Sequence, residues 1–377
     1  MSERHSILIV GLGDLGLRIA MRLGACADRM RLLLAARDTA RMRARAALIA
    51  ACAPACEVVF VPLDALDGDA LRATLRELNP DALVQCASMH SPWLLHGRHD
   101  PVAQRLRAAG FACELSAQLP VAHAVFAAAA GLSCLRINCS YPDVVNPVLA
   151  AAGLAPDVGI GNAGMIHALA ESALRQRGID GRLQTLAHHA HVTMTATGNF
   201  PNAHPGAHDT VDTGGSAPRF FLDGRSHSPH AIFDGIPAPG SSLALNELTA
   251  AHAVCMLRAY FGLTPPLHTA APGPQGRAGG WPLTVSAGRI DIDLPEGISG
   301  HDIQLFNAVA ARLDGVERIE GDGTVHFTDA LRSALGPELA SLAEPLTLAG
   351  APARYAELGA ALGLGPVPAG EPAGTCA

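Results

Sequence analysis

Three glycines near the start of the chain have the spacing that holds the phosphates of a nucleotide. Gly11, Gly13 and Gly16 follow an apolar run and form the pattern G-x-G-x-x-G, and a stretch with helical periodicity comes next. In such a turn the first glycine permits a sharp change of direction, the second lets pyrophosphate approach the backbone, and the third lets helix and strand touch. The amides at the positive end of the helix attract the anion. The predicted dinucleotide contacts in this turn are Gly11, Gly13, Asp14, Leu15 and Gly16.

The end of the next apolar run bears on which dinucleotide binds. Residues 31–36 are expected to form a second buried strand, and Arg37 and Asp38 follow it, about 20 residues after the last glycine, where such folds hold the adenine ribose. An acid there favours NAD(H), whereas the planar fork of an arginine suits the 2′-phosphate of NADP(H). We therefore expect NADP(H), held by Arg37 and Asp38. The alternative is an exposed arginine, with Asp38 on the ribose or capping the next helix.

A polar loop that carries a histidine follows the predicted strand 82–86. Because the carboxyl ends of parallel strands border the ligand crevice, we expect Ser88 at the cofactor and His90 beside its nicotinamide. Imidazole titrates near neutral pH, so His90 is a candidate for the proton exchange that accompanies hydride transfer. The alternative is a loop histidine that bonds only to backbone.

The segment 138–146 holds further polar candidates just after another predicted strand. Tyr141 and Asp143 are candidate catalytic residues and Asn146 is a candidate substrate contact, because they offer donors and acceptors to a hydroxyl or ammonium group. Asp143 also has a simpler explanation, as an acid in the first turn of a helix. Cys139 is a candidate thiol nucleophile of the kind that semialdehyde dehydrogenases use, or else a buried structural thiol.

Histidines are concentrated between residues 184 and 221. Alternation predicts a strand over 186–194, which puts His188 on the face opposite His189 and His191. No cysteine or H-x-x-x-H helix accompanies them, so we predict no metal site. A polar wall that binds the substrate is favoured instead, with an aromatic lid further along the chain. Its predicted residues are His191, His204 and Trp281.

The composition excludes several kinds of partner. The 377 residues are 49% hydrophobic and 16% charged, with a formal net charge of −7, so no net positive field attracts nucleic acid or an anionic membrane. We find no uninterrupted apolar stretch of spanning length and no room for a signal peptide before the first strand, and we expect a cytoplasmic protein with a small-molecule substrate. The nine cysteines lack C-x-x-C spacing, so neither a zinc ribbon nor a disulfide framework is predicted.

Short apolar runs alternate with helical patterns in the first third of the chain, which predicts an α/β fold with a doubly wound parallel sheet. One of these runs, 111–115, is a predicted strand. Beyond it we expect helices at 165–176, 243–260 and 301–313 and a hairpin over 316–327. The predicted organisation is a Rossmann domain over 1–137, an α+β substrate domain over 138–330, helices over 331–362 and a disordered tail over 363–377.

The N-terminal domain resembles that of the saccharopine dehydrogenase family. The resemblance rests on Gly-Leu-Gly-Asp-Leu-Gly at 11–16, a strand that ends Ala-Ala-Arg, Val-Pro-Leu-Asp at 61–64 and Asp-Ala-Leu-Val-Gln-Cys-Ala at 81–87. It covers roughly the N-terminal domain. The segment 138–146 is similar to the start of that family's substrate domain, except that Asp143 stands where the family usually has glycine.

This resemblance implies a Rossmann domain joined to an α+β domain whose sheet mediates homodimerisation, with the last helices returning to the first domain. It also implies that Asp64 and Ala87 line the adenine and ribose side of the cofactor site. The expected activity is NADP(H)-dependent hydride transfer at a C–N bond of an amino-acid-derived molecule, as imine reduction or amine oxidation. Two alternatives stay open: a semialdehyde dehydrogenase that needs Cys139, and an NADPH-sensing protein without catalysis.

Overall fold

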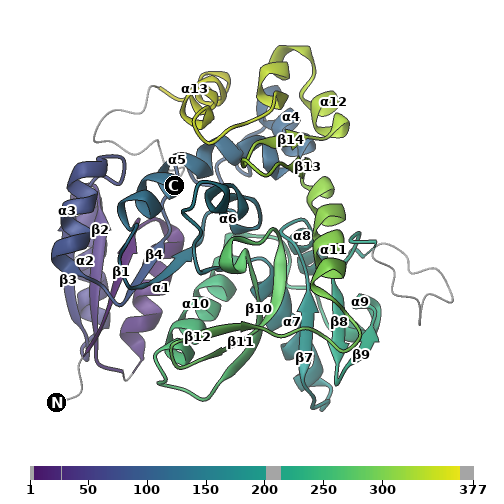
Figure 1. Cartoon of the computed structure of the whole chain (residues 1–377), viewed down its shortest axis with the longest axis horizontal. Coiled ribbons are helices and arrows are strands. Elements are labelled where there is room, and N and C mark those ends of the chain that lie inside the picture. The colour runs from purple at the N-terminus through teal and green to yellow at the C-terminus, as the bar shows by residue number, and fades with distance from the viewer. Residues whose placement is uncertain (1–3, 27, 201–213, 366–377) are drawn as a thin grey trace.

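The computed structural model describes residues 4–26, 28–200 and 214–365. A six-stranded, wholly parallel sheet in the order β3-β2-β1-β4-β5-β6 forms the N-terminal part of the fold (Figure 1). The chain reverses its direction of progress across the sheet between β1 and β4, and in such sheets a ligand crevice forms at the carboxyl ends of those two strands. The strands are β1 (His5–Val10), β2 (Met30–Ala36), β3 (Glu57–Pro62), β4 (Ala82–Gln85), β5 (Leu135–Asn138) and β6 (Val158–Gly159).

Helices cover both faces of this sheet, as the alternation of short apolar runs and helical patterns predicts. Successive side chains of a strand point to opposite faces. Leu8 and Val10 of β1 therefore pack in one core with α3, α4 and α5, while Ile7 and Ile9 pack in another with α1 and α2. The helices of this part are α1 (Asp14–Ala25), α2 (Ala40–Cys52), α3 (Gly68–Leu78), α4 (Pro101–Ala109), η1 (Phe111–Glu114), α5 (Leu115–Ala128) and α6 (Pro142–Ala151).

The second part of the fold combines helices with small antiparallel sheets. Two sheets have the orders β7-β8-β9 and β10-β11-β12, and β7 also contacts β10 and β11. Their strands are β7 (Leu183–Leu186), β8 (Arg219–Leu222), β9 (Arg225–His227), β10 (Leu267–Pro272), β11 (Gly280–Ser286) and β12 (Arg289–Ile292). The helices here are α7 (Ala163–Gln176), α8 (His191–Thr197), α9 (Pro229–Phe233), η2 (Leu243–Leu245), α10 (Asn246–Tyr260) and η3 (Pro274–Gly276).

The C-terminal elements return to the first part of the molecule. Helix α12 packs against α4 and α13 packs against α5, at the top of the view in Figure 1. The expected hairpin is present as β13 and β14. The elements of this region are α11 (Gly300–Leu313), β13 (Val316–Ile319), β14 (Val325–Phe327), α12 (Asp329–Leu335), η4 (Pro337–Ala343) and α13 (Ala351–Ala361). The boundary predicted at residue 137 lies before β6, which continues the parallel sheet.

Two predicted strands have a different conformation in the structure. Residues 111–115 belong to η1 and the start of α5, where every side chain from 112 to 122 is buried. A short apolar run of this kind does not distinguish a buried strand from a buried helix. The strand predicted over 186–194 ends at Leu186, and the chain turns into α8 through the hydrogen bond from the amide of His191 to the carbonyl of His188.

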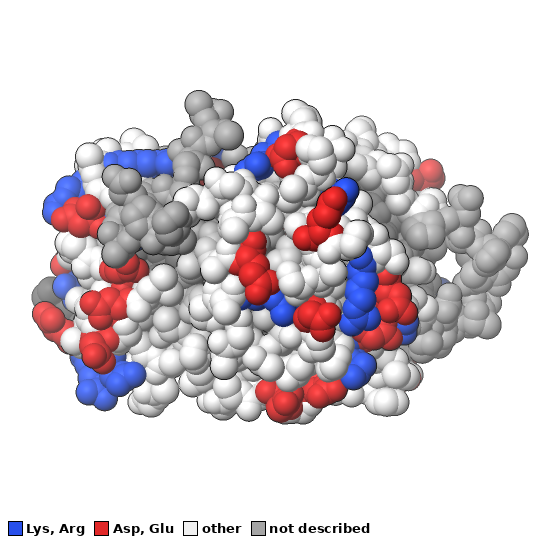
Figure 2. Space-filling model, turned by 90° about the horizontal axis from the view of Figure 1, so that it is seen from above, with Lys and Arg blue, Asp and Glu red and all other residues white. Residues whose placement is uncertain are grey.

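One helix in the described residues, Phe111–Ala128, is long and apolar enough by length and composition to cross a membrane, but 78% of it is buried inside the fold. It is therefore a core helix. On the face seen in Figure 2, acidic and basic side chains occur in small mixed groups separated by uncharged surface. That face presents no extended basic area of the kind that attracts phosphate backbones.

Candidate active site

A cavity of about 1020 Å³ opens at the carboxyl ends of β1, β4 and β5. One end is lined by the glycine-rich turn and the end of β2, and the other by residues of η1, α7 and the segment before α8. The cavity therefore lies where the reversal of strand order predicts a ligand. The predicted site residues that line it are Gly11, Gly13, Asp14, Leu15, Arg37, Asp64, Ala87, Ser88, His90 and Tyr141.

The three glycines of the turn differ in what surrounds them. Gly11 has a φ of +97° and lies against Ala87, whose atoms would be 2.8 Å from an added Cβ. Gly16 lies over the carbonyl of Gly11, which leaves no room for a side chain, whereas a Cβ on Gly13 would meet nothing within 4 Å. Gly13 caps α1 without a side-chain hydrogen bond, so the first amides of the helix are available to an anion. This open backbone fits a pyrophosphate.

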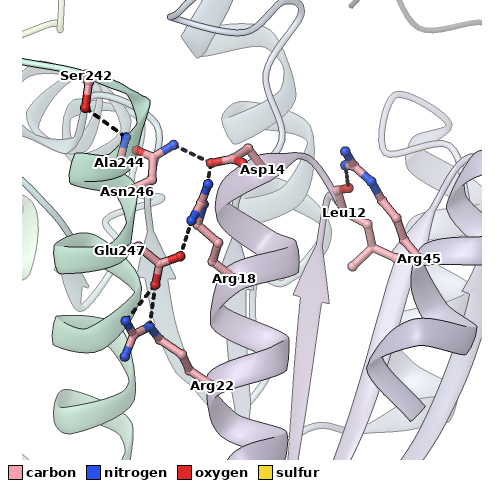
Figure 3. Close-up of polar contacts among 9 residues, drawn as sticks. All are labelled: Leu12, Asp14, Arg18, Arg22, Arg45, Ser242, Ala244, Asn246 and Glu247. Carbon is pink, nitrogen blue, oxygen red and sulfur yellow. Dashed lines mark hydrogen bonds and ion pairs between the residues drawn. The ribbon is translucent and has the colours of Figure 1, made fainter. Parts of the chain in front are cut away.

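Arginines gather at the end of the cavity next to β2. Arg37, Arg41 and Arg45 all line it, and Nη1 of Arg45 donates a hydrogen bond to the carbonyl of Leu12 in the glycine-rich turn (Figure 3). Asp38 is exposed, does not line the cavity and pairs with Arg43, with 2.6 Å between Oδ1 and Nε. The guanidinium groups at this end therefore fit an anionic group on the adenine ribose.

A set of charged side chains joins the glycine-rich turn to the second part of the molecule (Figure 3). Oδ2 of Asp14 accepts hydrogen bonds from Nε of Arg18 at 2.8 Å and from Nδ2 of Asn246 at 2.9 Å. Arg18 and Arg22 both pair with Glu247, so helix α10 is held against α1. Burial raises the pKa of Asp14, but the hydrogen bonds of Arg18 and Asn246 outweigh it and the net pKa is lowered. The charge of Arg18 therefore offsets that of the acid nearest to the expected pyrophosphate.

The opposite end of the cavity holds a histidine and a buried aspartate. Nδ1 of His189 donates a hydrogen bond to Oδ2 of Asp314 at 2.7 Å. Asp314 follows α11 and its side chain is 8% exposed, while that of His189 is 27% exposed and lines the cavity. The hydrogen bond fixes the orientation of the imidazole and leaves Nε2 as the nitrogen that can exchange a proton with a ligand.

Aromatic rings hold this imidazole in place. Phe111 stacks on His189 with 4.5 Å between ring centroids, and Tyr141 meets it edge-on at 5.1 Å. The hydroxyl of Tyr141 donates to the same carboxylate oxygen of Asp314, at 3.1 Å. Tyr141 has a φ of +42°, a backbone conformation that non-glycine residues rarely adopt and that is often found at functional sites.

The charges around His189 raise its pKa. Burial alone lowers the pKa of the ring, but the carboxylates of Asp314, Asp143 and Glu114 outweigh burial, so the net pKa is above its usual value. For Asp314 burial alone raises the pKa. The neighbouring imidazoles of His189 and His188 outweigh burial and hold the pKa of Asp314 well below its usual range. The pair therefore behaves as an imidazolium held by a carboxylate.

A second histidine and acid face the same cavity. Nε2 of His90 lies 3.0 Å from Oε2 of Glu114, and both side chains are almost completely buried. The loop that carries His90 is fixed to α5 because the amide of Met89 donates to the carbonyl of Ala117. The predicted catalytic histidine is thus at the cavity, with a carboxylate partner that the sequence analysis did not identify.

Several predicted site residues do not line the cavity. Gly16 lies beneath it, and Asp143 is buried, accepting hydrogen bonds from the amide of His189 and from Asn162. Asn146 bonds to Asn138 and to the carbonyl of Gly273. The ring of His191 bonds to the backbone of Gly215 and His188, and Trp281 is in the core. Asp38 is exposed outside the cavity, and His204 lies outside the described residues.

Cys139 lines the cavity next to Cys86, at the ends of β5 and β4. The hydrogen bond with Cys86 and burial both raise the pKa of the Cys139 thiol well above its usual value. Because the thiolate is the nucleophilic form, this environment does not favour a thiol nucleophile. No group of three or more His, Cys, Asp or Glu side chains able to hold a metal occurs among the described residues.

His189, Asp314 and Glu114 are the residues of this site that sequence reasoning missed. His189 belongs to the histidine-rich segment, but the incorrectly predicted strand drew attention to its neighbour His191. Asp314 is separated from His189 by 125 residues, and nothing in its local sequence indicates a partner. Glu114 lies in the apolar run that was predicted to be a strand.

No family model and no curated protein matches the chain. Solved structures match its fold. A lactate dehydrogenase from Eimeria maxima with NADH and oxamate has a TM-score of 0.52 at 11% identity, covering 83% of this chain and 94% of that one. A lactate dehydrogenase from Cryptosporidium parvum with lactic acid and nicotinamide adenine dinucleotide has a TM-score of 0.50 at 14% identity, covering 83% and 99%. The malate dehydrogenase of Cryptosporidium parvum has a TM-score of 0.49 at 15% identity, covering 82% and 97%.

These comparisons correct the resemblance inferred from the sequence. The matched structures with a TM-score of 0.50 or more reported above are lactate dehydrogenases, so membership of the saccharopine dehydrogenase family and hydride transfer at a C–N bond are wrong predictions. The physical reason is that a glycine-rich turn and alternating strands specify a dinucleotide-binding domain, which many unrelated activities share. The chain is therefore similar to lactate dehydrogenases in its fold, an α/β fold with a Rossmann-type parallel sheet and a second part with antiparallel sheets.

Proposed function

We propose that this protein is a nicotinamide-dinucleotide-dependent oxidoreductase that interconverts a carbonyl and a hydroxyl group, with His189 as the acid and base. The observation that carries the proposal is a single cavity that joins an open glycine-rich turn to the His189–Asp314 pair. Such a pair supplies the proton that carbonyl reduction needs, and positioning of the substrate in the cavity supplies much of the remaining acceleration. The nicotinamide, when bound, supplies or accepts the hydride.

His189 acts at the carbonyl oxygen of the substrate. In the reducing direction its Nε2–H donates a proton to that oxygen, while Nδ1–H keeps its hydrogen bond to Asp314. The raised pKa of His189 keeps the imidazolium available, and the carboxylate stabilises it. In the oxidising direction the neutral ring accepts the hydroxyl proton through Nε2. Phe111 and Tyr141 limit rotation of the ring, so the proton is delivered in one direction.

The printed ligands of the two lactate dehydrogenases agree with this chemistry. One is described with NADH and oxamate and the other with lactic acid and nicotinamide adenine dinucleotide. Both are thus dinucleotide enzymes that act at a hydroxyl carbon. A small-molecule substrate and a catalytic role are inferred here from the fold together with the His189–Asp314 pair, because fold alone does not determine activity. Homodimerisation and a cytoplasmic location stay predictions.

The preferred cofactor is NADP(H). Arg37, Arg41 and Arg45 line the end of the cavity where the adenine ribose is expected, while Asp38 is paired with Arg43 outside it. A carboxylate at the ribose would favour NAD(H), whereas guanidinium groups bind a 2′-phosphate. The arrangement of charges therefore supports selection of the phosphorylated cofactor.

Calorimetry and a substrate panel test the proposal. We expect NADPH to bind the purified protein more tightly than NADH. We also expect its reduced-nicotinamide absorbance to fall in the presence of one or more members of a panel of aldehydes, ketones and 2-oxo acids. A His189→Asn variant should bind NADPH normally and lose turnover. Failure of both cofactors to bind would refute the dinucleotide site, and normal turnover by His189→Asn would refute the role of His189 and leave His90 as the candidate.

A further inference from the structure

A second polar group lines the same cavity, apart from the His189–Asp314 pair. Glu114, Gln118 and His90 all line the cavity and each is 5% exposed or less. Glu114 and Gln118 are one helical turn apart on η1 and α5, so their side chains are on the same face. The ring of His90 is packed against Tyr355 of α13, with 5.6 Å between ring centroids. These residues form a fixed group that the proposed reaction does not use.

This group has unsatisfied hydrogen-bonding atoms. Among the described residues, Nδ1 of His90 and Nε2 of Gln118 are buried and have no hydrogen-bond partner. Buried polar atoms of folded proteins are nearly always bonded, and the exceptions usually mark a ligand or a functional site. Because the carboxylate of Glu114 can only accept, the proton of a neutral His90 is on Nε2, and Nδ1 is then an acceptor.

The charges at this end of the cavity disfavour an anionic substrate group. The carboxylates of Glu114, Asp143 and Asp314 are all close enough to His189 to raise its pKa. The arginines among the described lining residues are Arg37, Arg41 and Arg45 at the adenine end, and Arg107. Nη1 of Arg107 is bonded to the backbone carbonyls of Leu95 and Arg98. A substrate carboxylate beside Glu114 would therefore meet like charge and a ring lone pair.

We propose that Glu114, Gln118 and His90 form a substrate subsite for a hydroxyl or an ammonium group. That group donates to the carboxylate of Glu114 or to Nδ1 of His90, Nε2 of Gln118 donates to the oxygen of a bound hydroxyl, and the carboxylate of Glu114 repels a substrate carboxylate. This subsite rests on the proposed function, because it assumes that the substrate carbonyl reacts beside His189. The substrate is then a carbonyl compound that carries such a donor group at a distance from the reacting carbon. The 2-hydroxy acid class to which lactic acid belongs is not the substrate class of this site.

Binding of four matched, unreactive amides tests the subsite without any turnover. The probes are 3-aminopropanamide, 3-hydroxypropanamide, butanamide and succinamate, which share a carboxamide and differ at the far end. Ligand-observed NMR measures their affinities for the protein alone and for its complex with NADP⁺. We expect the amine and the hydroxyl to bind about tenfold or more tightly than succinamate, since hydrogen bonds to charged groups are worth this much. Equal or tighter binding of succinamate, or no binding of the amine and hydroxyl probes, would overturn the proposal.

Two variants assign the effect to these side chains. Glu114→Gln should weaken the amine probe about tenfold and strengthen succinamate, while Glu77→Gln, which removes the same charge from the exposed face of α3, should change neither. Gln118→Leu should weaken the hydroxyl probe, and provides an independent result if Glu114→Gln does not fold. An unchanged probe order in a folded Glu114→Gln variant contradicts the subsite. If the probes bind in the expected order but no carbonyl compound of the panel is reduced, the proposed function is refuted and the subsite is not.

Discussion

The two ends of the cavity differ in the sign of their charge. The end beside β2 is lined by Arg37, Arg41 and Arg45, whereas the end beside α5 and α11 is bordered by carboxylates. The glycine-rich turn borders the cationic end, and there Arg18 pairs with the charge of Asp14 while Asn246 donates a hydrogen bond to it. Since phosphate groups are anionic, the cationic end is the one that fits the phosphates of the proposed cofactor. The difference in charge also explains how a buried imidazole at the other end keeps a raised pKa.

The comparison also separates two ways of building a site. The cationic end comes from one short stretch of the chain, residues 37–45, and therefore leaves a signal in the sequence. The acidic end is assembled from Glu114, Asp143 and Asp314, which come from separate parts of the sequence. The end of α11 is brought to η1, where the amide of Ala112 donates to the carbonyl of Asp314, and Asp143 accepts from the amide of His189.

Replacement of His189 by asparagine is expected to have the largest effect. Asparagine cannot exchange a proton near neutral pH, so kcat with the best carbonyl substrate should fall by roughly 10²- to 10⁴-fold. Affinity for NADPH, measured by calorimetry, should not change. The exposed His301→Asn serves as the control and should retain full turnover. A loss of turnover that is accompanied by an equal loss of NADPH affinity would contradict a catalytic role.

The glycine-rich turn offers a matched pair of variants. Gly16→Ala forces a methyl group against the carbonyl of Gly11 and should lower the free energy of unfolding by about 1–3 kcal/mol, as overpacked positions do. Gly13→Ala meets no protein atom and should leave unfolding unchanged while weakening NADPH binding. Thermal denaturation and calorimetry on both variants check this. Equal effects of the two variants on cofactor affinity would contradict the assignment of Gly13 to the pyrophosphate.

Arg37→Ala should affect one cofactor and not the other. Loss of a charged hydrogen bond to the 2′-phosphate should weaken NADPH roughly 10- to 100-fold and leave NADH unchanged. Arg43→Ala is the control, because Arg43 pairs with Asp38 and does not line the cavity. Calorimetric titration of both nucleotides gives the comparison. If Arg37→Ala weakens NADPH and NADH equally, the arginine does not distinguish the phosphate.

The pH dependence of carbonyl reduction is expected to show that carboxylates raise the pKa of His189. His189 must be protonated to donate, so kcat/KM should be constant at low pH and fall as pH rises through the pKa of His189, which lies above its usual value of 6.5. Glu114→Gln removes one of the carboxylates that raise this pKa, so the fall should begin at lower pH. The exposed Glu77→Gln should leave the profile unchanged. A midpoint that rises in Glu114→Gln would contradict the charge arrangement.

The sequence predicted the elements around the glycine-rich turn correctly, but it did not predict the residues at the acidic end of the cavity. The G-x-G-x-x-G spacing, the buried strands and Arg37 are local features, and each is at the cavity where the pattern predicts. Residues 111–115, predicted as a strand, are helical and contain Glu114, while the strand predicted over 186–194 is a turn that contains His189 followed by the start of α8. These misassigned elements are the reason that the acidic end could not be anticipated.

By itself, then, the amino-acid sequence determined the parallel sheet and the phosphate-binding turn, because both follow from periodicity and glycine spacing within short segments. Only the tertiary structure decided which histidine meets an aspartate. His189 and Asp314 are separated by 125 residues, and their hydrogen bond depends on the packing of η1 and α11 rather than on any local pattern. The pKa of His189 has the same origin, since a charge acts through space and the sequence does not state which charges will be near.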